Sequence, residues 1–260
     1  MDALRNPSSN HLTPDLADGS ASGLTGPLRV VSNVIAQGGL GGGLLLIVIM
    51  GMAHFALAQF VLLLNDPVQV GMNFWPSAGL TLGVLLLVPT RRWGWALAAV
   101  AAAEFTSNVI HGHPFSVNIW FMGSNTIEPL IGATLIRRFG QHQGSLIPIR
   151  GFLELIVFGA LIAPVFGGAI GSVGSMNAGA VYLDAWPRFA VGDALGVLVV
   201  APVLLTFRRT HDNHPMTRAI APAVITTVVA AFAIHSWPGG WDTVTPYLVI
   251  PPLIWAALRS

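Results

Sequence analysis

Asp193 is a carboxylate within a long apolar run, where ionisable side chains are rare. A charge at the centre of a bilayer costs roughly 2.5–3.5 kcal/mol on insertion scales, so a partner, a water-filled cavity or a function must offset the cost. Gly192 and Gly196 are four residues apart, on one face of a helix, which predicts that another backbone approaches closely beside the acid. The stretch 189–207 is therefore predicted to be the membrane-spanning helix around which the chain is organised.

Other polar side chains occur inside the neighbouring apolar runs. Asn125 and Glu128 are three residues apart, and Glu104 and Asn108 are four apart, so each pair shares a helix face. We expect these groups to converge on a ligand-binding or signalling site that opens to the outer side of the membrane. The candidate site residues are Trp75, Ser77, Glu104, Asn108, Asn125, Glu128, Arg188 and Asp193. The alternative is that the acids, protonated or hydrogen-bonded, only hold helices together.

Arg188 is expected to be the counter-charge of Asp193 or Glu104, since it is the one cation predicted at the outer ends of the helices. His54 has no second histidine at a ligand spacing and is expected to be packed or hydrogen-bonded rather than to bind haem or a metal. His111, His113 and His235 together form a weak metal-site candidate.

Motifs of enzymatic chemistry are absent from the sequence. It contains no P-loop, no dinucleotide fingerprint and no His-Glu-x-x-His, and nothing fixes a Ser–His pair. Cysteine and lysine are both absent, which excludes disulfides, thiolate metal sites and lysine-based covalent catalysis. No metal, no cofactor and no catalytic residue is expected within this chain.

The composition is that of a membrane protein. Of the 260 residues 53% are hydrophobic and 9% are charged, whereas a soluble domain carries about 25% charged residues. The net charge of +1 argues against nucleic-acid binding, because nucleic-acid-binding domains are usually strongly basic. Residues 1–38 are polar and are expected to form a disordered cytoplasmic tail, followed by an integral membrane domain at 39–260.

The pattern predicts an all-α, polytopic transmembrane bundle of about eight spans. The predicted spans are 41–64, 74–88, 93–110, 117–136, 151–171, 189–207, 219–236 and 247–258. Eleven of the twelve arginines lie on one side if the spans alternate, and the opposite segments 65–73, 111–116, 172–188 and 237–246 contain only Arg188. By the positive-inside rule, both termini are cytoplasmic.

Two of the predicted spans share a local pattern. Gly79 and Gly83 precede Pro89 with the same spacing at which Gly192 and Gly196 precede Pro202, and each pattern contains Leu-Gly-Val-Leu. This similarity suggests a parallel duplication of a four-helix unit, although chance among Gly-, Leu- and Val-rich helices is an equal alternative. All four glycines are candidate helix-packing positions, with Gly79 and Gly83 the expected neighbours of Gly192 and Gly196.

Three motifs resemble a known family. They are Phe-Trp-Pro-Ser-Ala-Gly at 74–79, Asn-Thr-Ile-Glu at 125–128 with Gly132 and Arg137-Arg138, and Gly-Asp-Ala-Leu-Gly-Val-Leu at 192–198 with Pro202. In order and spacing the chain from about 74 to 259 is similar to the membrane-associated sensor domain of the first MASE type. The resemblance implies a multi-pass sensory module of the bacterial inner membrane. Such modules precede a cytoplasmic histidine kinase, PAS or diguanylate cyclase domain, in two-component or cyclic-di-GMP signalling.

We therefore expect a sensor that is not itself an enzyme and that relays a helix rearrangement to an output domain in cis. Its expected partners are the lipid bilayer and an unknown small ligand or membrane protein, and a homodimer is left open. The sequence ends at Ser260 without an output domain, so either a truncated or a stand-alone module is expected. The alternative function is a small-solute membrane transporter or a substrate-binding membrane subunit.

Overall fold

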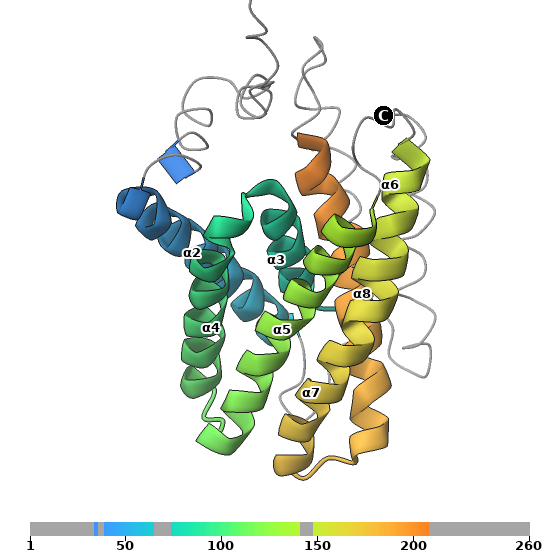
Figure 1. The fold of residues 1–260 in the computed structure, drawn as a ribbon. Helices are drawn as coiled ribbons and strands as arrows, with labels where there is room; N and C mark the ends of the chain where they lie inside the picture. Colours follow the sequence, from blue (N-terminus) through green and yellow to red (C-terminus); the bar gives the residue numbers. More distant parts are fainter. Residues whose placement is uncertain (1–33, 36–38, 65–73, 141–147, 208–260) are drawn as a thin grey trace, which may run out of the picture.

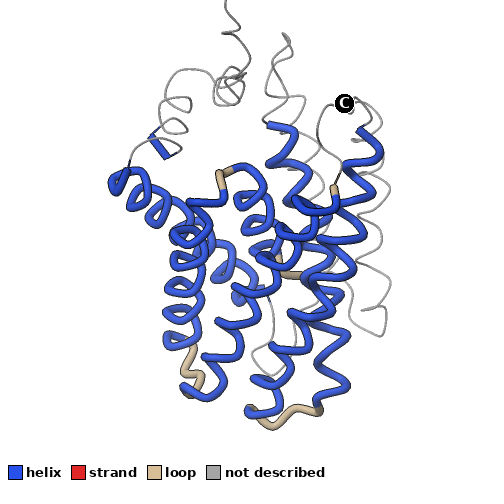
Figure 2. Tube along the Cα trace, in the orientation of Figure 1, coloured by secondary structure: helices blue, strands red, loops and turns tan. Residues whose placement is uncertain are grey.

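The computed structural model describes residues 34–35, 39–64, 74–140 and 148–207, and within these ranges the regular structure is entirely helical (Figures 1 and 2). The predicted N-terminal tail and the predicted spans 219–236 and 247–258 lie outside the described residues.

The helices follow one another with short connections. They are α2 (Gly39–Leu64), α3 (Pro76–Leu87), the 3₁₀ turn η2 (Thr90–Arg92), α4 (Trp93–Ile110), α5 (Phe115–Phe139), α6 (Pro148–Glu154), the π-helical segment η3 (Leu155–Ile162), α7 (Ala163–Asn177) and α8 (Tyr182–Phe207). In the described part, three stretches are long and apolar enough to cross a membrane: Gly39–Leu62, Arg150–Asn177 and Tyr182–Leu205. The helical class is confirmed, and the count of eight spans stays a prediction.

The expected outer segment 172–188 is mostly helical in the structure, which corrects the sequence analysis. α7 continues to Asn177, α8 begins at Tyr182, and Gly179 makes the turn between them with a φ of +95°. Pro187 and two nearby charges give this segment the composition of a loop. However, Asp184 lies in the first turn of α8, where a negative side chain favours the helix N-terminus.

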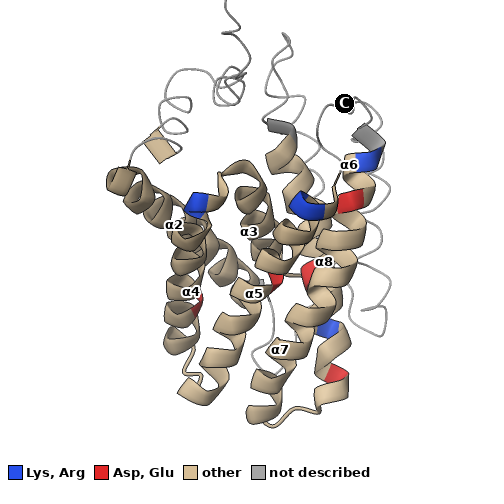
Figure 3. Ribbon diagram, in the orientation of Figure 1, with Lys and Arg blue, Asp and Glu red and all other residues tan. Residues whose placement is uncertain are grey.

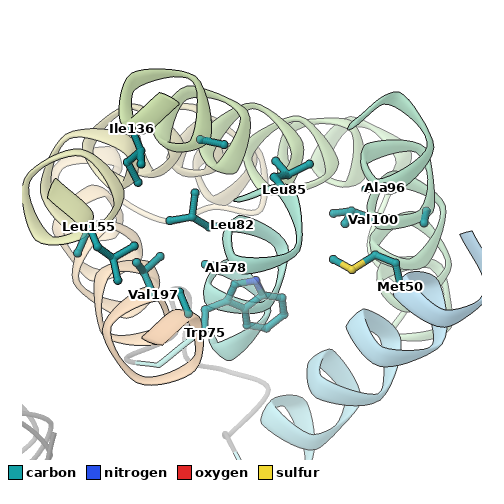
Figure 4. Packing of buried hydrophobic residues seen from close by; sticks show 14 of the residues in the cluster. Met50, Trp75, Ala78, Leu82, Leu85, Ala96, Val100, Ile136, Leu155 and Val197 are labelled. Carbon is teal, nitrogen blue, oxygen red and sulfur yellow. The ribbon is translucent and has the colours of Figure 1, made fainter. Parts of the chain in front are cut away.

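α3 lies at the centre of the described bundle, with apolar neighbours on both sides. Leu82, which is 1% exposed, packs toward Leu155 and Val197, whereas Leu85 lies nearer the side that carries Met50 and Val100 (Figure 4). Helices α2 and α4 cover the second side, and α5, η3 and α8 cover the first. α3 therefore contacts both groups of helices.

One end of the bundle gathers arginines (Figure 3). The Arg137 guanidinium donates to the carbonyls of Leu85 (2.9 Å) and Val88 (2.6 Å) and lies 4.9 Å from the centroid of the Trp93 ring. These bonds satisfy carbonyls that the end of α3 leaves without intrahelical partners. We call this the arginine end.

Candidate functional site

A first buried polar cluster joins α2, α4 and α5. His54 Nε2 lies 3.1 Å from Glu104 Oε2, and Asn108 Nδ2 donates to the other oxygen of Glu104 at 3.1 Å. Asn108 also donates to Asn118 Oδ1 at 3.3 Å. All four side chains are at most 6% exposed, so the carboxyl group of Glu104 relies on these partners. We call His54, Glu104, Asn108 and Asn118 the His54 cluster.

Ser77 links the His54 cluster to α3. Its hydroxyl donates to the carbonyl of His54 at 3.5 Å, and its own carbonyl accepts a bond from Thr81 at 2.8 Å. Both hydroxyl groups are fully buried. The polar face of α3 therefore points to α2, while its glycines point to α8.

A second cluster joins α5 and α8. The carboxyl groups of Glu128 and Asp193 are hydrogen-bonded to each other, and the two residues are 3% and 4% exposed. A hydrogen bond between two carboxyl groups needs a proton to donate, so at least one of the pair is neutral in this arrangement. We call these residues the carboxyl pair.

α7 makes room for the carboxyl pair. A Cβ atom added to Gly167 would lie 2.7 Å from Cβ of Glu128, which is closer than real side chains approach. One turn earlier on α5, the Ser124 hydroxyl donates to the carbonyl of Gly167 at 2.7 Å. Three helices thus meet at the carboxyl pair, and the spacing of α5 and α7 is fixed there by a glycine and a hydroxyl group.

Trp75 ties the start of α3 to the same place. Its indole Nε1 donates to Asn125 Oδ1 at 2.7 Å, and its backbone N–H donates to the carbonyl of Gly192 at 3.0 Å. Asn125 and Gly192 are on the helices that carry Glu128 and Asp193, respectively. Movement of the carboxyl pair would therefore be transmitted to α3 through directional bonds.

Of the eight predicted site residues, Glu104, Asn108, Glu128 and Asp193 belong to these clusters. Ser77 and Trp75 donate hydrogen bonds to the helices that carry the clusters, and Asn125 accepts the bond from Trp75. Sequence reasoning assigned neither His54 nor Asn118 to the site. The only signal was that each is a polar residue within an apolar helix, which does not name a partner.

Arg188 differs from expectation. It is exposed on α8 and forms no ion pair with Asp193 or Glu104, both of which are buried. Because α8 is helical through this stretch, Arg188 and Asp193 are five residues apart and point about 140° away from each other. The prediction that Arg188 is the counter-charge of these acids is therefore wrong. The buried acids are held by hydrogen bonds instead.

The weak metal site falls partly outside the described residues, where His235 lies. Within them, no group of three or more His, Asp or Glu side chains is placed to hold a metal ion. The ring of His111 instead contacts the carbonyl of Ser107 at 2.8 Å, and His113 packs edge-on against Phe121 with 5.9 Å between ring centroids.

Residues 43–260 match the family model of MASE1. The chain belongs to the MASE1 family. MASE1 is a membrane-associated sensor domain, so the buried clusters described above lie within the sensory part of a membrane signalling protein. The family resemblance inferred from the sequence is confirmed.

A curated relative of this MASE1 chain is the "Probable diguanylate cyclase DgcE" of Escherichia coli (strain K12). It is 22% identical over 218 residues, which cover 83% of this chain and 19% of the relative. The chain thus spans about a fifth of the length of that protein. No solved structure matches the chain.

Proposed function

We propose that this MASE1 chain is the input module of a bacterial inner-membrane signalling protein. A small ligand or a membrane partner changes the packing of α3, α5, α7 and α8 around the carboxyl pair, and the change reaches a cytoplasmic output domain. The observation that carries the proposal is the bond between Glu128 and Asp193, which joins two helices through groups that can gain or lose a proton.

The carboxyl pair has the properties of a two-state element. With a shared proton, Glu128 and Asp193 attract each other and hold α5 against α8. Without it, two negative charges face each other in a medium of low dielectric constant, where repulsion is far stronger than in water. A ligand or partner that favours one arrangement shifts the population of the other by as much as its affinities for the two differ.

The relative supports the type of output. Its printed name is that of a probable diguanylate cyclase, and this chain matches only a fifth of its length, so a catalytic domain outside the matched segment is the natural output for a MASE1 input. The arginine end supports a signal that is directed toward the cytoplasm. Basic residues gather there, namely Arg91 and Arg92 in η2 and Arg137 and Arg138 in the last turn of α5, and positively charged residues favour the cytoplasmic side.

A chimera tests the proposal. Residues 43–260 of this chain would replace the matched segment of DgcE, and cyclic di-GMP would be measured in membranes that contain equal amounts of protein. The comparison is with DgcE from which the matched segment has been deleted. We expect the chimera and the deletion to differ in cyclic di-GMP formation, because the input module sets the arrangement of the output domain. Equal rates would contradict the proposal.

A further inference from the structure

A cavity of about 380 Å³ opens at the arginine end, apart from the two buried clusters. It lies where α2 begins beside the junction of η2 and α4. Its lining consists of Gly39, Leu40, Arg91, Arg92 and Trp95. The proposed signalling mechanism assigns no role to these residues.

Arg92 is an unusual residue in this lining because it is only 6% exposed. Its Nη1 donates to the carbonyl of Gly39 at 2.6 Å, but its buried Nε has no hydrogen-bond partner among the described residues. A buried guanidinium that lacks an anion is costly, since the bond to a neutral carbonyl does not balance its charge. Among the described residues no anion faces this guanidinium, so an anion in the cavity would supply the partner that it lacks there.

The N-terminal turn of α2 adds to the positive character of the cavity. The first N–H groups of a helix have no intrahelical partners, and the helix dipole is positive at that end. Gly42 and Gly43 let the arginine and the indole approach this turn. A Cβ on Gly42 would overlap the carbonyl oxygen of Val34 and would also lie 3.1 Å from Nη2 of Arg92, and one on Gly43 would lie 2.6 Å from the Trp95 ring.

The surface beside the cavity is apolar. Leu40 lines the cavity, and Leu44 and Val48 continue from it along α2 at intervals of four residues. Their exposed fractions are 67%, 51% and 55%, so they form an open apolar stripe. A ligand with an anionic head and a hydrocarbon chain fits both features, with the head in the cavity and the chain along the stripe.

We infer that this cavity binds the phosphate of an anionic phospholipid headgroup. The two arginines supply charge-assisted hydrogen bonds to the phosphate oxygens, for which the guanidinium fork is well shaped. Trp95 forms part of the cavity wall, and tryptophan side chains are enriched at membrane–water interfaces. The same chemistry would also accept the phosphate of a water-soluble molecule, and the experiment separates these two sources.

The test measures lipid binding to the purified chain. Protein would be reconstituted with phosphatidylglycerol or with phosphatidylcholine, and lipids that remain bound after mild delipidation would be counted by native mass spectrometry. The test variants are Arg92→Gln and Arg91→Gln, the second of which retains the bond between Arg92 and Gly39. The control is Arg138→Gln, which removes the same charge from an exposed position at the same end.

We expect wild type and Arg138→Gln to retain phosphatidylglycerol equally, and the two test variants to bind it about tenfold more weakly, the loss expected for one charge-assisted hydrogen bond. Arg91→Gln keeps the test decisive if Arg92→Gln fails to fold, because it leaves the bond between Arg92 and the carbonyl of Gly39 in place.

A third arm adds inorganic phosphate to protein in phosphatidylcholine. Stabilisation by inorganic phosphate that equals the effect of phosphatidylglycerol, and that is lost in Arg91→Gln, would overturn the lipid assignment in favour of a soluble phosphate. Equal retention of phosphatidylglycerol by wild type and all variants would overturn the anion site itself. If Arg138→Gln lost as much phosphatidylglycerol as the test variants, the anion site would also be overturned, because lipid retention would then depend only on the overall charge of the protein. These readouts do not involve signalling, so they are independent of the proposed function.

Discussion

Gly79 of α3 lies directly against Gly196 of α8. A Cβ on Gly79 would overlap the carbonyl oxygen of Gly196, and a Cβ on Gly196 would overlap the carbonyl oxygen of Trp75. The next contact along α3, Gly83, meets Ala201 and Leu204 further along α8, so the two helices run in the same direction. Backbones that touch in this way hold Trp75 in place for its bonds to Asn125 and Gly192.

Gly196→Leu should therefore destabilise the bundle. Overpacking of a close-packed interior costs about 1–3 kcal/mol, and the neighbour here is backbone, which cannot rotate away. The midpoint of thermal unfolding in detergent should fall. Leucine itself is favourable in lipid, so a lipid-facing glycine would tolerate the change.

The structure also identifies the proper control. From sequence alone, Val199→Leu and Val200→Leu are expected to matter less than Gly196→Leu. However, Val199 is 3% exposed, and Cβ of Val200 lies 2.9 Å from the position of a Cβ on Gly79. Val191→Leu is the better control, because Val191 is 41% exposed on the same helix. Equal melting of wild type and Gly196→Leu would show that α3 and α8 do not touch here.

The His54–Glu104 contact can be measured by a double-mutant cycle. His54→Leu and Glu104→Leu should each destabilise, because each leaves a buried polar partner unpaired. The double variant should lose less than the sum, with a coupling on the order of 1 kcal/mol, as for other interhelical hydrogen bonds in membranes. Unfolding of the reconstituted protein gives the four free energies. In a control cycle, the free-energy changes of Glu104→Leu and Arg138→Leu should be additive. A coupling energy of the same size in the two cycles would remove the support for a direct bond between His54 and Glu104.

The sequence predicted most helix positions because apolar runs and arginine pairs mark them well. The helix at 93–110 is found with its predicted ends, and α3 differs by only two residues at its start. The polar positions within spans could also be recognised as exceptional, since bilayers penalise them. These signals are local, so they need no knowledge of the tertiary structure.

Partners could not be predicted in the same way. Nothing in the sequence places His54 of α2 beside Glu104 of α4, fifty residues away. Charge alone suggests that Arg188 pairs with Asp193 or Glu104, but the helical course of α8 directs the side chains of Arg188 and Asp193 apart. The pairing of glycines between α3 and α8 was suggested by their common pattern, whereas the duplication of a whole four-helix unit is untested.

The turn between α4 and α5 should make stability depend on pH. Burial lowers the pKa of His113 below its ordinary value of 6.5, and the nearby His111 lowers it further, while Glu104 partly opposes them. In the unfolded chain His113 takes up a proton at a higher pH than in the folded chain. Stability is therefore full above the ordinary value of 6.5 and declines as the pH falls below it.

Melting temperatures across this range check the expectation. His113→Gln should reduce the loss of stability on acidification, and His111→Gln should reduce it to a smaller extent because it removes only the second cause. An unchanged pH profile in His113→Gln would assign the acid sensitivity to other groups.

The orientation can be determined with paired reporters. The arginine end should be cytoplasmic by the positive-inside rule. A fluorescent protein that matures only in the cytoplasm should be bright after Ser260 and dark when inserted between Gly112 and His113, in an exposed turn. Alkaline phosphatase, which is active only outside the cytoplasm, should show the reverse pattern. This orientation would be refuted if each reporter gave the same signal at the two sites.

The central claim is that the bond between Glu128 and Asp193 carries the signal, and the DgcE chimera tests it most directly. Glu128→Gln and Asp193→Asn keep size and hydrogen bonding but remove the shared proton. The matched control is Asp184→Asn, which changes an exposed acid on the same helix.

The account predicts that both test variants fold, melt within a few degrees of wild type, and change cyclic di-GMP formation by about fivefold or more, the lower range of allosteric couplings. It also predicts that Asp184→Asn forms cyclic di-GMP at the wild-type rate. Wild-type rates in both Glu128→Gln and Asp193→Asn would contradict the account and leave the carboxyl pair as a packing element.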